Sequence, residues 1–243
     1  MRVATRLKLG YLGVAAVDTW LAGVALPGSF QRGTRLARAA RFVTKPALMP
    51  LLAGSFATDR RAFGSPLRSS TLVGQVFGWG GDIALLGHGS RSFAVGAGSF
   101  GLGHVAYISG FVRHRSPAPF FRAPATRAAL GLWALAGPAM AVAAARQDRA
   151  LGPAVAAYTG VLAGTFATGC HLSRSVPVSS RCLTAAGAGL FLLSDTVLGV
   201  RQFLLPLVMR SAPSPRLDAT LERVVMGSYA AAQLLLAEGA ARA

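Results

Sequence analysis

Residues 77–86 read Phe-Gly-Trp-Gly-Gly-Asp-Ile-Ala-Leu-Leu, so that Asp82 is the one charged residue in an otherwise apolar run. An ionised side chain in hydrocarbon costs roughly 2.5–3.5 kcal/mol on insertion scales, and such a residue therefore marks a functional site by default. The pattern returns at Leu190–Leu198, where Asp195 is the one acid in an apolar segment. Two isolated acids of this kind suggest one shared site.

The composition is that of a membrane protein. Of the 243 residues, 53% are hydrophobic and only 14% are charged, whereas soluble domains carry roughly 25% charged residues. The 29 Gly and 13 Pro agree with this, because both residue types are more frequent in membrane helices than in soluble ones. We therefore expect an all-α, polytopic membrane helix bundle in which residues 1–243 form one domain.

The apolar segments number eight, and each is close to the length that a helix needs to cross about 30 Å of hydrocarbon. Gln31–Arg41 and Arg201–Arg216 are expected to be connections between them. The segments are Leu9–Leu26, the one that opens at Phe42, Thr71–Gly87, Ser92–Val112, Ala128–Ala145, Leu151–His171, Leu183–Val200 and Leu217–Ala240.

The first segment resembles a secretory signal peptide, but it contains Asp18 and lacks a clean cleavage site, so we interpret it as a membrane helix that is retained. An even number of spans places both termini on the same side. A small excess of Lys and Arg on that side favours cytoplasmic termini, in what is expected to be a bacterial plasma membrane.

The charge balance is strongly basic, with 25 Lys and Arg against 8 Asp and Glu and a formal net charge of +17. The arginines cluster in short intervals between apolar runs and form no long basic face, which indicates contact with anionic lipid headgroups rather than with nucleic acid. Cys170 and Cys182 flank one such interval. Two cysteines in a membrane bundle more often serve as small packing residues, so no redox role is expected.

Nine polar residues within the apolar segments are candidates for one site. If a bundle buries them together, they form a polar pocket with two carboxylates and several acid, base and hydrogen-bonding partners. Zinc-hydrolase and serine-hydrolase motifs are missing from the sequence, and no cofactor is expected. A metal held by three of the nine, Asp82, His104 and Asp195, is a less favoured alternative. The nine are Lys45, Asp82, His104, Tyr107, Tyr158, Ser194, Asp195, Tyr229 and Gln233.

The order of these residues resembles that of the YhhN-like family of lysoplasmalogenases over nearly the whole chain. The matching motifs on successive segments are Lys45-Pro46, Gly81-Asp82, Gly103-His104 with Tyr107, Tyr158, Phe191 with Ser194-Asp195, and Tyr229 to Gln233. The resemblance implies an integral membrane hydrolase that cleaves the vinyl ether bond of a lysoplasmalogen or a related ether lysolipid. The products would be a fatty aldehyde and a glycerophospho-headgroup, with lysophospholipid and membrane lipid as the only expected partners.

Vinyl ether hydrolysis suits a pair of carboxyls, because one must protonate the β carbon while the other stabilises the resulting cation or activates water. Asp82 and Asp195 are the expected catalytic pair, and the sequence leaves open which acid takes which part. The substrate-binding set would orient water or hold the glycerol oxygens, with Lys45 near the membrane surface to meet the phosphate. Its members are Lys45, His104, Tyr107, Tyr158, Ser194, Tyr229 and Gln233.

Two other functions remain open. A proton-coupled small-molecule transporter would use the same buried acids as a proton relay. A purely structural or lipid-binding protein would need no convergence of the acids at all. The hydrolase and the transporter both require Asp82 and Asp195 to face the same space, whereas the structural or lipid-binding protein does not.

Overall fold

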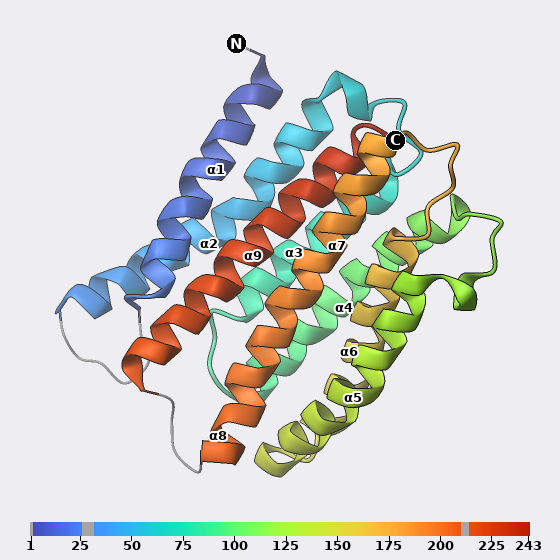
Figure 1. The fold of residues 1–243 in the computed structure, drawn as a ribbon. Coiled ribbons are helices and arrows are strands. Elements are labelled where there is room, and N and C mark those ends of the chain that lie inside the picture. The colour runs from blue at the N-terminus through green and yellow to red at the C-terminus, as the bar shows by residue number, and fades with distance from the viewer. Residues whose placement is uncertain (1, 26–31, 210–213) are drawn as a thin grey trace.

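The computed structural model describes residues 2–25, 32–209 and 214–243, and this part of the chain is a bundle of helices (Figure 1). The predicted all-α fold class is confirmed. Short 3₁₀ turns, η1 (Arg60–Ala62) and η2 (Phe120–Arg122), lie in the connections. The α-helices are α1 (Val3–Ala22), α2 (Arg32–Thr58), α3 (Arg68–Ala84), α4 (Gly89–Arg113), α5 (Pro124–Gln147), α6 (Leu151–Gly169), α7 (Val178–Gly199), α8 (Leu205–Met209) and α9 (Pro215–Ala240).

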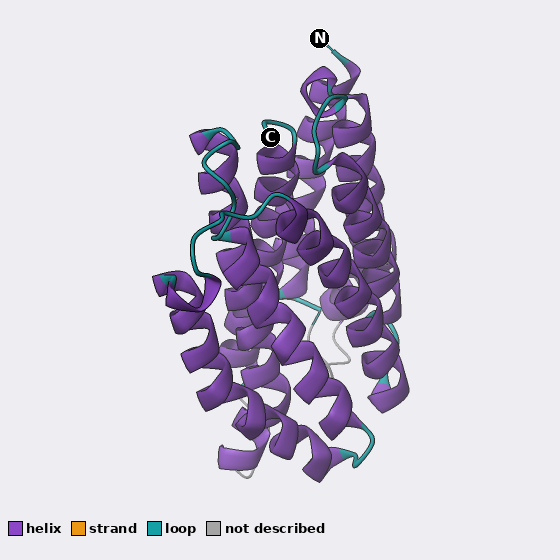
Figure 2. Cartoon of the chain, turned by 90° about the vertical axis from the view of Figure 1, so that its right-hand side faces the viewer, coloured by secondary structure: helices purple, strands orange, loops and turns teal. Residues whose placement is uncertain are grey.

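Half of the long helices have the length and the apolar composition that a membrane-spanning helix needs. Among the described residues, four helices are long and apolar enough to cross a membrane, namely Gly89–Arg113, Pro124–Gln147, Leu151–Gly169 and the rod Val178–Met209. The other long helices carry more charge or, in the case of α3, are shorter. They pack into the same bundle, and the helices run along a common direction with the connections at the two ends (Figure 2).

The helices pack in close pairs, α1 with α2, α3 with α4, α5 with α6 and α7 with α9. Figure 1 shows α7 and α9 side by side, with the first turn of α1 and the last of α9 at the same end of the bundle. Small residues make the closest approaches possible. A Cβ on Gly187 of α7 would lie 2.9 Å from the backbone nitrogen of Leu236, and one on Gly103 of α4 would lie 3.0 Å from the carbonyl oxygen of Gly74.

Helix α2 begins ten residues before the predicted start at Phe42, and the prediction of a loop over Gln31–Arg41 is wrong from Arg32 onward, Gln31 itself lying outside the described residues. The arginine-rich stretch has a helical period of buried positions, since Thr34 and Ala37 are buried on the face that Lys45 continues. The arginines lie at other positions of the helix, not at these buried ones. Because there are so many of them, the helical period of buried residues is hard to recognise in the sequence.

Two prolines lie inside α2, at positions 46 and 50. Pro50 has no N–H, so the carbonyl of Pro46 loses its helical donor, and the indole Nε1 of Trp79 on α3 donates to that carbonyl at 2.9 Å. Such compensation by a neighbouring helix is how membrane helices tolerate proline. Lys45 is therefore in the interior of a long helix, and its predicted place at a helix start is corrected.

The predicted connection Arg201–Arg216 is also wrong over its first half. A π-helical segment, η3 (Val200–Leu204), continues α7 into α8, so that helical structure extends to Met209. Phe203 is 2% exposed and anchors this continuation in the core, while Arg201 bonds to Asp218 and Glu222 of α9. Because acids on a neighbouring helix compensate the charge of Arg201, the helix continues through this residue.

Candidate functional site

A cavity of about 50 Å³ lies within the bundle and is lined by side chains from α2, α3, α4, α6, α7 and α9. A single water needs about 10–15 Å³, so the cavity admits several. Six of the nine candidate residues line it: Lys45, Asp82, Tyr158, Ser194, Asp195 and Tyr229. The two isolated acids thus face the same space, although they lie 113 positions apart in the chain.

Asp82 is almost fully buried, with 1% of its surface exposed. The hydroxyl of Tyr229 donates to its Oδ2 at 2.7 Å, and Nζ of Lys45 lies 3.9 Å from its Oδ1. Lys45 is itself buried and also lines the polar space beyond the cavity. A buried carboxylate is tolerated when a cation and additional hydrogen bonds compensate its lost hydration, and Asp82 has both.

The glycine before Asp82 gives the cavity part of its wall. A Cβ on Gly81 would lie 2.5 Å from the ring of Phe100, which lines the cavity from α4. The Phe100 ring packs edge-on against the ring of Tyr229, with centroids 5.7 Å apart. Gly81 therefore lets an aromatic wall approach α3 directly beside the acid.

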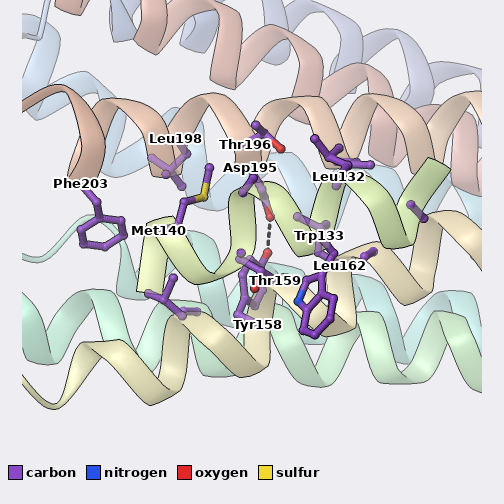
Figure 3. A pocket seen from close by; sticks show the side chains of 18 of the residues that line it. Leu132, Trp133, Met140, Tyr158, Thr159, Leu162, Asp195, Thr196, Leu198 and Phe203 are labelled. Atoms are coloured by element: carbon purple, nitrogen blue, oxygen red, sulfur yellow. Dashed lines mark hydrogen bonds between the residues drawn. The ribbon is translucent and has the colours of Figure 1, made fainter. Parts of the chain in front are cut away.

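Asp195 has different surroundings. It is partly exposed, and the hydroxyl of Tyr158 on α6 donates to its Oδ2 (Figure 3). Among the described residues, Tyr158 is the one hydrogen-bond or ion-pair partner of this carboxyl. The neighbouring Ser194 is fully buried, and its hydroxyl donates to the carbonyl of Val225 at 3.0 Å, which ties α7 to α9.

Three of the candidates lie behind the cavity wall instead of lining it: His104, Tyr107 and Gln233. The Tyr107 hydroxyl donates to Oε1 of Gln233 at 2.9 Å, and Nδ1 of His104 lies 3.1 Å from the hydroxyl of Thr165. The His104 ring packs against Tyr158 with centroids 5.9 Å apart. This polar layer supports the side chains that line the cavity.

Two further spaces adjoin the cavity, and sequence reasoning identified neither. A polar vestibule of about 340 Å³ shares Lys45 with the cavity and is lined by Arg201 and Glu222. An apolar groove of about 60 Å³ between α5, α6 and α7 shares Asp195 and Tyr158 with it. The acid pair therefore lies where a polar space and an apolar space meet.

Ion pairs surround the vestibule. Nε of Arg201 lies 2.6 Å from Oδ1 of Asp218, and Nη1 of Arg41 lies 3.1 Å from Oε1 of Glu222. Asp18, which sequence analysis left outside the site, accepts hydrogen bonds from Thr44 at 2.6 Å and from Arg41 at 3.4 Å. Opposite charges on different helices were the available signal, but the sequence alone does not say which helices are neighbours.

A metal site would need several ligands close together. In residues 2–25, 32–209 and 214–243, no group of three or more His, Cys, Asp and Glu side chains is arranged to hold a metal ion. Cys170 and Cys182 are free thiols, one half-buried and one exposed. The chemistry available at the cavity is that of carboxyls, phenols and one ammonium group.

Residues 40–240 match the model of the YhhN family, so the chain belongs to that family. The match spans α2 to α9 and includes all of the cavity-lining residues described above. Comparisons with curated proteins and with solved structures gave no match.

Proposed function

We propose that this YhhN-family protein is a membrane hydrolase that cleaves the vinyl ether bond of a lysoplasmalogen or a related ether lysolipid. The observation that carries the proposal is the pair of carboxyls, Asp82 and Asp195, which line one cavity large enough for several waters and have unlike partners. Position supports it too, because the cavity lies between a polar vestibule and an apolar groove, as the reactive bond of a lysolipid lies between its headgroup and its chain.

The reaction needs one acid and one water. A carboxylic acid adds a proton to the β carbon of the vinyl ether, which leaves an oxocarbenium ion centred on the carbon next to oxygen. Water adds to that carbon and returns a proton to the carboxylate, giving a hemiacetal. Collapse of the hemiacetal releases a fatty aldehyde and the free hydroxyl of the glycerophospho-headgroup.

Asp195 is the proton donor in this proposal. Its carboxyl accepts one hydrogen bond, from the Tyr158 hydroxyl, and has no cationic partner among the described residues, so the cost of burying a charge beside the apolar groove outweighs that one bond and favours the neutral form. Asp82 is the carboxylate, because the ammonium of Lys45 and the hydroxyl of Tyr229 both stabilise a negative charge there. Two carboxyls in unlike surroundings divide acid and base roles in the same way in glycosidases.

Lys45 acts on Asp82 rather than on a phosphate at the membrane surface. The headgroup phosphate is received by the vestibule, where Arg201, which already donates to Asp218 and Glu222, supplies the planar guanidinium of the lining. The water that attacks the cation enters from the same polar side.

The test is product formation by the purified protein in detergent. We expect fatty aldehyde and glycerophospho-headgroup in equal amounts from a lysoplasmalogen. In deuterated water the aldehyde should carry one deuterium on the carbon next to its carbonyl, and in ¹⁸O-labelled water the glycerol hydroxyl should remain unlabelled. A lysolipid with a saturated alkyl ether bond is the matched control, since it has no carbon–carbon double bond whose β carbon could accept a proton.

The proton-coupled transporter makes the opposite prediction from the same acids. Uptake of a small molecule into sealed vesicles without chemical change, together with no aldehyde from any vinyl ether lipid, would overturn the hydrolase proposal.

A further inference from the structure

The apolar groove between α5, α6 and α7 has no role in proton transfer, and its place beside Asp195 points to one occupant. We infer that this groove binds the hydrocarbon chain of a single-chain lipid and receives it sideways from the bilayer. That this hydrocarbon chain belongs to the substrate rests on the proposed function. That the groove binds a hydrocarbon chain does not.

The lining of the groove is almost wholly hydrocarbon. On α5 it extends from Ala129 to Met140, a rise of eleven residue steps or about 16 Å along the helix axis. Leu162 of α6 and Leu198 of α7 form the facing sides (Figure 3).

The open side of the groove faces the lipid. Leu132 and Trp133 line it from α5, one of the four helices suited to span a membrane, and each is 41% exposed. In that part of the bundle exposed apolar surface meets acyl chains rather than water, so a lipid chain reaches the groove without crossing a polar layer.

Trp133 is fitted closely into the groove wall. A Cβ on Gly137 would lie 3.1 Å from the indole Nε1, and one on Gly160 of α6 would lie 3.6 Å from the same atom. The two glycines leave room for the ring across the contact between α5 and α6. The indole ring therefore bounds the groove on its α5 side, next to the surface that faces the lipid.

The groove passes the reacting carboxyl. Tyr158 and Asp195 line both the groove and the acid cavity, and Figure 3 shows their hydrogen bond midway along the groove. A chain that occupies the groove from its open side up to this point presents its oxygen-bearing end to Asp195. The β carbon of a vinyl ether belongs to the chain, so a donor on the chain side is where the proposed mechanism needs one.

Tryptophan fluorescence tests the binding without any catalysis. The probe is a lysolipid with a saturated ether bond and bromine atoms along its chain, because bromine quenches an indole that it touches. A protein with Trp20→Phe and Trp79→Phe keeps Trp133 alone. We expect saturable quenching that an unbrominated analogue reverses. The matched control keeps only Trp20, which is 61% exposed and far from the groove, and reports non-specific quenching in the micelle.

Substitution at the groove tests the same point through turnover. Ala136→Phe fills the groove, whereas Ala139→Phe adds the same side chain at an exposed position of α5 outside it. A hydrophobic pocket discriminates by about tenfold or more, so the ratio of kcat/KM for long-chain over short-chain vinyl ethers should fall at least that far in Ala136→Phe alone. Leu132→Ala removes partly exposed wall and should weaken quenching without threatening the fold.

The outcomes separate the two proposals. Saturable quenching of Trp133 without hydrolysis would keep the groove and overturn the proposed reaction. Hydrolysis with quenching of Trp133 no stronger than that of Trp20, or with equal effects of Ala136→Phe and Ala139→Phe, would overturn the groove and keep the reaction.

Discussion

Asp82 and Asp195 line the same cavity, yet the α3 side and the α7 side of that cavity treat a carboxyl differently. On the α3 side, Asp82 is 1% exposed and has a cation, Lys45, and a phenol, Tyr229, as partners. On the α7 side, Asp195 is partly exposed toward an apolar groove and has one phenol, Tyr158. The two acids are alike in sequence context and unlike in surroundings.

The difference teaches that burial alone does not determine what an acid can do. A cation 3.9 Å away together with a hydrogen-bond donor favours a carboxylate, whereas an apolar space without a cation favours the acid form even though one phenol donates there. Substitutions that exchange or remove these partners should therefore act unequally on the two sides.

Loss of the proton donor should have the largest effect. Asp195→Asn keeps the shape of the side chain but cannot give up a proton, and general acid catalysis contributes about 10²–10⁴-fold. We expect kcat to fall toward the upper part of that range, and in Asp82→Asn by about 10²-fold, through loss of charge stabilisation. Steady-state aldehyde release by folded variants measures both. A greater loss in Asp82→Asn than in Asp195→Asn would reverse the assignment.

Removal of the cation should act on stability. Lys45→Met leaves the Asp82 carboxylate buried without its counter-ion, which costs about 3–5 kcal/mol of unfolding free energy. The double variant Lys45→Met with Asp82→Asn should recover most of that loss, since no buried charge remains. Denaturant unfolding of the single and double variants checks this. If the two are equally unstable, Lys45 does not serve as the counter-ion of Asp82.

The two tyrosines should differ by a smaller amount. A hydrogen bond to a charged group contributes about 1.5–3 kcal/mol and one to a neutral group about 1 kcal/mol. Tyr229→Phe, on the side of the carboxylate, should therefore destabilise the protein more than Tyr158→Phe, on the side of the acid. Unfolding free energies of the two variants give the comparison, and equal losses would mean that the two carboxyls share one protonation state.

Asp59, at the end of the bundle, is an acid outside the site, and its substitution should have the smallest effect. Asp59 accepts hydrogen bonds from Arg61, which lower the pKa of this carboxyl below its ordinary value of 3.8. The resulting stabilisation is present above the ordinary pKa and is lost as the pH falls through the lowered one. Because Arg61 is 44% exposed, Asp59→Asn should cost no more than about 1 kcal/mol at neutral pH. Unfolding curves at several acidic pH values should then decline less steeply for the variant than for the wild type.

The sequence predicted those parts of the site that stand out against their surroundings. Asp82 and Asp195 are conspicuous because an acid in an apolar run has a high cost, and the helix bundle follows from the same apolar runs. The depth of Lys45 was mispredicted because proline is usually a mark of the first turn of a helix. That Trp79 would satisfy the carbonyl freed by Pro50 depends on a contact between α2 and α3 that no local pattern specifies.

The groove could not be predicted from the sequence, because its residues do not stand out from their surroundings. Leu132, Trp133 and Leu162 are ordinary residues for a membrane helix, where a side chain that faces lipid and one that faces a groove have the same composition. The ion pair of Arg41 with Glu222 joins helices far apart in the chain, and only the packed bundle brings them together.

The meeting of the vestibule and the groove at the acid pair also governs how products depart. Under the proposed reaction, cleavage at this point divides one amphiphile into a water-soluble half and an oil-soluble half, each already lying in the space that leads to its own solvent. In that reaction the glycerophospho-headgroup would leave through the vestibule and the aldehyde would diffuse into the bilayer. Because the two exits would be separate, turnover should slow when the membrane accumulates aldehyde and should be insensitive to a headgroup product that is diluted in water.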